Sequence, residues 1–349
     1  MSTFRLGLIE GFYGRQWSWP ERHDMASFLA DAGYSHYVYA PKGDGSLRAQ
    51  WREPFVDLQN LTHFSAYCRG LGLKFGVGLS PMGLQLSYSD RDRAVLRDRL
   101  NELAAIGLDT LWILFDDMRG DHADLAASQS RVMHDVRDVF DGELAVCPGY
   151  YSFDPVLDEV FGERPANYLQ DLDAGLDASV DILWTGAKVI CETLTVEDCR
   201  QFTELTGRKP LLWDNYPVND GRKTSPFLHL NAFTGRDPAI KQAAAGHFAN
   251  PMNQPSLSKI PLMTLPQLYS DYTDADQLRR ASLDRLPADL SQVLERDWAR
   301  FQRQGLDGLS DREKRALLHE YRSLPHPAAK EVCDWLEGGY TFDPECLTG

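Results

Sequence analysis

Asp116 and Asp117 are the residues of this sequence whose type and position most clearly suit chemistry. They directly follow the apolar run 110–115, TLWILF. A continuous apolar run of this length is typical of a strand buried on both faces, so we expect the pair at the end of such a strand. Two carboxylates in a closed pocket cannot both ionise cheaply, so we expect the pKa of one to be raised. A protonated acid beside an ionised carboxylate is what general acid catalysis requires. Taken alone, the pair fits an acidic loop or a helix N-cap equally well.

A metal site is another interpretation of the same segment, because Asp116, Asp117, His122 and Asp124 all carry ligand-type side chains. No H-x-H or H-E-x-x-H spacing supports it. The six cysteines, at positions 68, 147, 191, 199, 333 and 346, include no C-x-x-C pair. We therefore expect no metal and no cofactor, and we expect reduced, mostly buried thiols. Sensitivity to a chelator would separate the two interpretations of the aspartates.

Eight short apolar runs alternate with helical segments along the chain, which is the pattern of βα units. The predicted strands are 4–9, 34–40, 73–79, 110–115, 144–147, 181–184, 210–213 and 247–250. The predicted helices include one that begins at Pro20, one with Leu61, Phe64, Cys68 and Leu71 on one face, and those over 90–106, 125–140 and 196–205. This order predicts an α/β protein with a (β/α)8 TIM-type barrel. A doubly wound sheet is the alternative, but no G-x-G-x-x-G turn or P-loop supports it.

The character of the chain changes from about residue 273, where amphipathic helical segments replace the strands. We predict a catalytic barrel over residues 1–272 and a short helical C-terminal extension over 273–349. The extension is more amphipathic than a barrel requires, so we also expect a homodimer.

Polar residues follow most of the predicted strands, and in a (β/α)8 barrel the active site lies at this end of the strands. The sequence places Lys42 after the second strand, the aspartate pair after the fourth and Thr185 after the sixth. Such groups suit a substrate rich in hydroxyls. Each is weak evidence by itself, since loops are usually polar.

Composition limits the kind of partner. The 349 residues are 43% apolar, enough for a sizeable core, and carry a formal net charge of −15. Such a charge repels phosphate backbones and anionic membranes, so neither nucleic acid nor membrane is the expected partner. The sequence shows no 18-residue apolar run and no signal-peptide pattern at its start, and a cytoplasmic location is expected.

Six segments together resemble a known family. They are GLIEGFYGRQWSW (7–19), YVYAPKGDGSLRAQWREPF (37–55), ILFDDM (113–118), LWTGAKV (183–189), LLWDNYPVND (211–220) and FANPMNQPSLSKIPL (248–262). Their order and content resemble the catalytic domain of glycoside hydrolase family 84, the β-N-acetylglucosaminidases that include protein O-GlcNAcase. The resemblance covers roughly residues 4–270. It implies a retaining, substrate-assisted exo-glycosidase that removes terminal β-linked GlcNAc from a glycan or glycoconjugate through an oxazoline intermediate.

The resemblance also implies roles for individual residues. Asp116 resembles the group that polarises the 2-acetamido group, Asp117 the general acid/base, and Tyr151 the donor to the acetamido oxygen, with Tyr150 as the alternative. The residues that resemble holders of the sugar hydroxyls are Gly11 (through its backbone), Lys42, Asn215, Asp220 and Asn253. Those that resemble the pocket lining are Trp184, Thr185, Val189 and Trp213. An endo-acting hyaluronidase-type enzyme and a non-catalytic GlcNAc-binding barrel are the alternative functions.

Overall fold

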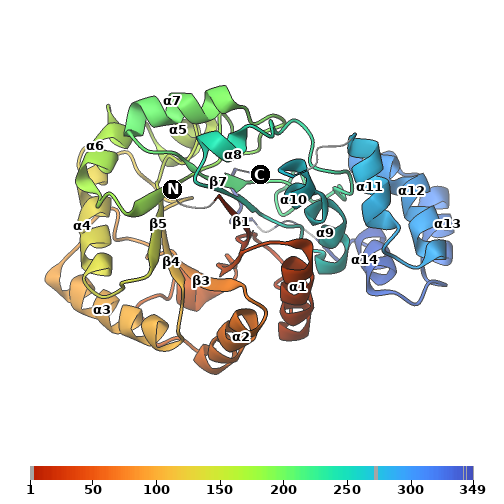
Figure 1. The fold of residues 1–349 in the computed structure, drawn as a ribbon, viewed down its shortest axis with the longest axis horizontal. Coiled ribbons are helices and arrows are strands. Elements are labelled where there is room, and N and C mark those ends of the chain that lie inside the picture. Colours follow the sequence, from red (N-terminus) through yellow and green to blue (C-terminus); the bar gives the residue numbers. More distant parts are fainter. Residues whose placement is uncertain (1–3, 271–273, 341, 343, 349) are drawn as a thin grey trace.

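The computed structural model describes residues 4–270, 274–340, 342 and 344–348, and its centre is a closed barrel of eight parallel strands (Figure 1). The strands pair in chain order, β1 to β8, and β8 pairs with β1. They are β1 (Arg5–Glu10), β2 (His36–Tyr39), β3 (Lys74–Leu79), β4 (Thr110–Leu114), β5 (Glu143–Cys147), β6 (Val180–Trp184), β7 (Leu211–Asp214) and β8 (Gly246–Ala249). The predicted α/β fold of the (β/α)8 type and all eight predicted strands are confirmed.

Helices surround the barrel. Those of the first eight βα units are α1 (Trp19–Ala32), α2 (Leu58–Gly70), α3 (Asp90–Ala105), α4 (Leu125–Arg137), α5 (Val156–Phe161), α6 (Tyr168–Gly175), α7 (Val196–Thr206), α8 (Ile240–Ala243), α9 (Pro255–Leu262) and α10 (Thr264–Leu268). The later helices are α11 (Ala275–Leu283), α12 (Ala288–Arg303), α13 (Asp311–Tyr321) and α14 (Pro327–Leu336). Short 3-10 turns lie at Gly45–Leu47 and Leu306–Gly308. No helix within the described ranges has the length and apolarity to cross a membrane.

Local chemistry explains where α1 begins and ends. The Ser18 side chain accepts from the backbone N–H of Glu21, and the Glu21 carboxylate accepts from that of Ser18, which makes a capping box. Pro20 occupies the first turn, where its missing N–H costs nothing. Gly33 ends the helix at a φ of 89°, a left-handed conformation that glycine adopts without strain. The predicted start at Pro20 is therefore correct to within one residue.

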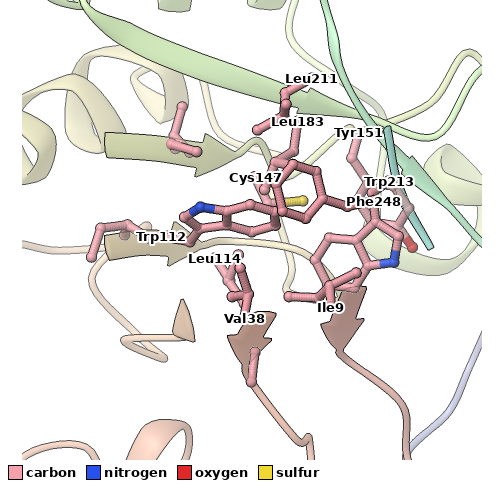
Figure 2. Packing of buried hydrophobic residues seen from close by; sticks show 14 of the residues in the cluster. Ile9, Val38, Trp112, Leu114, Cys147, Tyr151, Leu183, Leu211, Trp213 and Phe248 are labelled. Atoms are coloured by element: carbon pink, nitrogen blue, oxygen red, sulfur yellow. The ribbon is translucent and has the colours of Figure 1, made fainter. Parts of the chain in front are cut away.

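Alternation along the strands fills the barrel interior. Every second residue points inward, and the inward set includes Ile9, Val38, Trp112 and Phe248, which Figure 2 shows packed together. The rings of Trp112 and Phe248 meet edge to face with 4.7 Å between centroids. Gly7 faces the Phe248 ring, and a Cβ there would lie 2.1 Å from it. The interior is therefore a packed core and forms a solid floor beneath the C-terminal ends of the strands.

Below this floor, charged side chains close the N-terminal end of the barrel. Arg5 donates to Asp181 at 2.6 Å, and Glu143 accepts hydrogen bonds from Lys74 and, at 3.2 Å, from His36. The pKa of Glu143 is lowered to about 2, chiefly by the hydrogen bond from His36. These inward-facing charges are paired with one another, so this layer serves stability at the end of the barrel opposite the strand tips.

The helices α11–α14 lie to one side of the barrel, beside α9 and α10 (Figure 1). A second hydrophobic cluster joins their side chains, such as Leu294 and Trp335, to barrel-side residues such as Leu230 and Leu257. The predicted boundary between residues 272 and 273 falls outside the described residues. The helical character of the segments after it is as expected, whereas α5, α6, α8, α9 and α10 were not foreseen.

Glu331 of α14 links the later helices to the barrel. Its carboxylate accepts from the backbone N–H groups of Ser256 and Leu257, in the first turn of α9, at 2.9 and 2.8 Å. Burial raises the pKa of Glu331 to about 7 although these two hydrogen bonds oppose the rise. The carboxylate thus satisfies N–H groups that the start of a helix leaves without internal partners.

We predict that this carboxyl makes stability depend on pH. Because its folded pKa of about 7 exceeds the ordinary 4.5, the folded chain binds more protons than the unfolded chain between these values. The contribution of Glu331 to the free energy of unfolding is therefore greatest below the unfolded pKa and is lost as the pH rises through the folded pKa. As the pH rises through this window, the free energy of unfolding of the natural chain should fall by up to about 1.4 kcal/mol per pH unit relative to that of Glu331→Gln. Urea unfolding of both chains across it measures the difference, and a difference independent of pH would contradict the prediction.

Candidate active site

A pocket opens at the C-terminal ends of the strands, directly above the apolar floor. Its lining comprises Gly11, Tyr13, Lys42, Asp116, Asp117, Cys147, Tyr151, Thr185, Val189, Ile190, Trp213, Asn215, Val218, Asp220, Asn250, Cys346 and Thr348. Ten of the twelve residues singled out from the sequence are among them.

Strand alternation explains how the polar groups reach this pocket. Leu114 points into the barrel, so Asp116, two residues later, points inward just beyond the strand. Phe248 and Asn250 are related in the same way, as are Trp213 and Asn215. On these three strands, an inward-facing apolar residue is therefore followed, two residues later, by a polar residue of the pocket.

Asp116 lies deep in the pocket, 5% exposed. Its Oδ2 accepts a hydrogen bond from Lys42 Nζ, and Lys42 also lies 5.6 Å from the centroid of the Trp213 ring. The other oxygen, Oδ1, is buried and has no hydrogen-bond partner among the described residues. A buried carboxylate oxygen is costly to leave unpaired, and this one belongs to a residue that lines the pocket. The arrangement suits a ligand that donates an N–H or O–H to Oδ1.

Asp117 is less buried, and both its oxygens accept hydrogen bonds from tyrosines. Tyr13 donates to Oδ2 and Tyr151 donates to Oδ1, each at 2.8 Å. The backbone of Asp117 has a φ of 56°, a conformation that costs energy for a residue with a Cβ. Such strain persists where the surroundings impose it, and it turns two consecutive carboxylates toward the same pocket.

An amide network forms another wall. Asn215 Oδ1 accepts from Trp213 Nε1 at 3.0 Å and from Asn250 Nδ2 at 3.1 Å. Asn250 Oδ1 in turn accepts from the backbone N–H of Gly11 at 3.3 Å. A Cβ on Gly11 would lie 2.4 Å from the Trp213 ring, so only glycine lets the chain approach here. The wall offers donors and acceptors in fixed positions, as recognition of sugar hydroxyls requires.

Asp220 is buried and accepts from the backbone N–H of Tyr13 at 2.7 Å. Burial raises its pKa to about 6, and the nearby Asp117 contributes in the same direction. It is therefore a pocket carboxyl that changes its proton occupancy close to neutral pH.

A buried ion pair fixes the loop that carries Val189 and Ile190. Arg236 donates to both oxygens of Asp214, at 2.8 and 2.7 Å, and also to the carbonyls of Cys191 and Glu192. Burial alone would raise the pKa of Asp214, but the charge and hydrogen bonds of Arg236, with a hydrogen bond from His247, hold it below its ordinary value. Arg236 thus ties this loop to the end of strand β7.

Two predicted pocket residues lie elsewhere. Trp184 is out of phase with the inward-facing Leu183, so it points away from the barrel axis and packs against Phe202 of α7, with 4.9 Å between ring centroids. Asn253 lies beyond the strand end, and its Nδ2 donates to the carbonyl of Tyr13 at 2.8 Å. It holds the Tyr13 loop, and the asparagine that reaches the pocket is Asn250.

The structure also distinguishes the two consecutive tyrosines. Tyr151 lines the pocket, as predicted, whereas Tyr150 donates to the carbonyl of Gly162 at 2.6 Å and lies under the Arg164 guanidinium.

Tyr13, Asn250, Cys346 and Thr348 line the pocket but are not among the residues singled out from the sequence. The step of two residues from Phe248 points to Asn250. Nothing local in the sequence points to Cys346 or Thr348, which reach the pocket from beyond the last helix.

The side chains weighed as metal ligands do not gather. His122 Nε2 lies 2.5 Å from the backbone carbonyl of Gln85, and groups of three or more metal-ligating side chains are absent from the described part of the chain.

Comparison with known proteins agrees with this geometry. A family model described as beta-N-acetylglucosaminidase matches residues 6–295. The chain belongs to this family. The resemblance to glycoside hydrolase family 84 is thereby confirmed.

Three relatives are identical to this β-N-acetylglucosaminidase family member at only about a quarter of the aligned positions. Protein O-GlcNAcase of Rattus norvegicus and that of Mus musculus are each 27% identical over 282 residues, which cover 76% of this chain. The chain spans only 30% of the length of either. A mutant of the O-GlcNAc hydrolase of Thermobaculum terrenum has a similar structure, with a TM-score of 0.78 and 27% identity over 97% of this chain and 81% of that one.

Proposed function

We propose that this protein is a retaining exo-β-N-acetylglucosaminidase that removes terminal β-linked GlcNAc by substrate-assisted catalysis. The observation that carries the proposal is the buried Oδ1 of Asp116, which has no hydrogen-bond partner among the described residues and lies beside Asp117 in a pocket walled by amides. An acetamido N–H is the donor that would satisfy this oxygen. Membership of the family supports the same activity.

In the first step, the acetamido oxygen attacks the anomeric carbon and the glycosidic bond breaks. Asp117 gives its proton to the departing oxygen, and Asp116 Oδ1 accepts the acetamido N–H, whose positive character grows as the oxazoline ring closes. Lys42 donates to Oδ2 of Asp116, and this contact orients the carboxylate so that Oδ1 remains for the substrate. In the second step Asp117 takes a proton from water, which attacks the same face and opens the ring. Since the substrate supplies the nucleophile, the usual carboxylate-separation rule for retaining enzymes does not apply.

Tyr151 and the amide wall position the sugar. Tyr151 now donates to Asp117, and by turning its hydroxyl to the acetamido carbonyl it would hold that oxygen for attack while freeing Asp117 Oδ1. Gly11, Asn215 and Asp220 also line the pocket and suit the remaining hydroxyls. Thr185, Val189 and Trp213 complete the lining.

The closed floor supports the exo mode. Trp112 and Phe248 fill the barrel directly below, so a sugar that enters the pocket can extend only outward. A terminal GlcNAc on a glycan or glycoconjugate fits this geometry, and the mechanism requires neither metal nor cofactor. The cytoplasmic location, the absence of nucleic acid and membrane partners, and the homodimer stay predictions.

The acetamido requirement tests the function. Aryl β-GlcNAc should be hydrolysed at least ~10³-fold faster than aryl β-glucoside, since the glucoside lacks the internal nucleophile. Proton NMR of the early mixture should show the β-anomer of GlcNAc. Comparable glucosidase activity, or α-anomer formed first, would refute the mechanism, and cleavage inside hyaluronan chains would refute the exo mode.

The two aspartates should respond differently to replacement. Asp117→Ala should slow substrates with poor leaving groups most, because acidic phenols need little protonation. Asp116→Asn should lower kcat/KM by ~10²–10³-fold for every leaving group, the usual size for loss of one electrostatic stabiliser. A series of aryl β-GlcNAc substrates measures both. If the two variants exchange profiles, the roles within the pair are reversed.

A further inference from the structure

Tyr13 is the meeting point of several buried contacts around the carboxylate pair. Its hydroxyl donates to Asp117 Oδ2, and its backbone N–H donates to Asp220. Behind it, Arg48 Nη1 donates to the Tyr13 oxygen at 2.6 Å, and the guanidinium lies 5.0 Å from the centre of the ring. Tyr13 is 4% exposed and Arg48 6% exposed. The contact between Arg48 and Tyr13, behind Asp117, is thus shielded from water.

The direction of these hydrogen bonds is fixed by chemistry. A guanidinium has only donors, so the Tyr13 oxygen must accept from Arg48, and its single proton must point to Asp117. Burial raises the pKa of Tyr13 well above its ordinary value, and the charge of Asp117 adds to this, so the phenol keeps that proton. Asp117 Oδ2 therefore always faces a donor.

The other oxygen of Asp117 has a different status. Among the described residues, no Lys or Arg side chain donates to the hydroxyl of Tyr151, its partner. No cation therefore fixes the direction of that hydroxyl, and a bound acetamido group can draw it away from Asp117. Once that happens, Oδ1 is left to carry a proton, while Oδ2 stays occupied by Tyr13.

We propose that Arg48, acting through Tyr13, is a positioning residue that reserves Asp117 Oδ1 as the atom that gives and later recovers the catalytic proton. This inference rests on the proposed function and deepens it. In the first step the proton leaves Oδ1 for the glycosidic oxygen, and in the second Oδ1 receives one from water. Arg48 also places a second positive charge, after Lys42, next to the carboxylate pair.

The test compares Tyr13→Phe, Arg48→Met and Arg48→Lys with the natural chain, and Tyr34→Phe serves as matched control. Tyr34 is a buried tyrosine whose hydroxyl donates to the carbonyl of Leu262 at 2.6 Å, remote from the pocket. Thermal unfolding of each variant identifies any that fails to fold.

Tyr13→Phe and Arg48→Met should lower kcat/KM by roughly 10- to 100-fold for aryl β-GlcNAc with a poor leaving group and far less for acidic phenols. Arg48→Met should also move the basic limb of the pH profile upward, since a positive charge beside the carboxylates is lost. Arg48→Lys should restore that limb in part, and Tyr34→Phe should match the natural chain. An equal loss for all leaving groups, with an unmoved limb, would overturn the inference. Failure of the natural chain itself to cleave β-GlcNAc would instead refute the proposed function.

A different observation concerns the segment after α14. Tyr340 lies beneath the Arg15 guanidinium, Phe342 beneath that of Arg222, and further along Cys346 and Thr348 line the catalytic pocket. Thr348 and Tyr151 line the same pocket, and the Thr348 side chain is near enough to the Tyr151 hydroxyl to interact with it. Cys346 and Thr348 share this lining with Trp213 and Asn215, so the segment lies near the C-terminal end of β7.

We infer that residues 344–348 occupy the mouth of the pocket and compete with the substrate. The contact uses Tyr151, whose hydroxyl the substrate's acetamido group would need. Substrate can bind only to molecules whose pocket the segment has left, so the apparent affinity is the intrinsic affinity multiplied by that fraction. If the segment fills the pocket in about nine molecules of ten, KM is about tenfold higher than without the segment. The segment thus acts as a built-in inhibitor.

Deletion of residues 342–349 should lower KM for aryl β-GlcNAc roughly 3- to 10-fold with little change in kcat. A synthetic peptide of residues 342–349 should inhibit the shortened chain competitively. An unchanged KM together with no inhibition would overturn the inference.

The thiol of Cys346 gives a second readout that needs no activity, because the other five cysteines are buried. Thr348→Val, which removes the hydroxyl that meets Tyr151, should speed modification of Cys346 by a maleimide. Leu347→Ala is the control, since that side chain is 57% exposed and lies outside the pocket lining. Equal rates of Cys346 modification in the natural chain, Thr348→Val and Leu347→Ala would contradict a role for Thr348 in holding the segment in the pocket. This outcome does not depend on which substrate the enzyme hydrolyses.

Discussion

The alternation of side chains along eight parallel strands is the constraint on which the rest of this structure depends. Because the barrel is closed, inward-facing residues have no alternative surface, and Trp112, Leu114 and Phe248 must fill it. The next inward positions then belong to the pocket, which places Asp116 and Asn250 over a rigid apolar base. Packing of the inward-facing residues therefore fixes the positions of the catalytic groups. A shift of one residue in the register of a strand would turn the polar side chain at its end away from the pocket.

Charge balance is the second requirement. Three carboxylates, Asp116, Asp117 and Asp220, share one pocket, and two cations, Lys42 and Arg48, stand behind them. Each cation reaches the pair by a directed contact, one directly and one through a phenol. Because these carboxylates and cations have little exposure to water, each contact between them is stronger than it would be in water. For the same reason, a carboxylate oxygen left without a hydrogen bond costs more free energy.

Much of this architecture could be predicted from the sequence, and the errors have clear causes. The strands were evident because doubly buried strands are continuous apolar runs, and the aspartate pair because it follows one. Trp184 resembles a pocket residue by its motif, but it is out of phase with the inward-facing Leu183. Asn253 lies beyond the end of β8 at Ala249, where the alternation of the strand no longer determines which way a side chain points. Tyr13 could not be distinguished from a packing residue, since its role depends on Arg48, which folding brings to it.

The path of the last described residues has a practical consequence for handling the protein. Cys346 and Thr348 lie in the pocket, whereas Arg5, at the start of β1, belongs to the ion-paired layer at the opposite rim of the barrel. A purification tag or surface linker joined beyond residue 348 would emerge beside the catalytic groups and alter access to them. The same sequence joined ahead of β1 would emerge on the far side, so immobilised or labelled protein should be attached there.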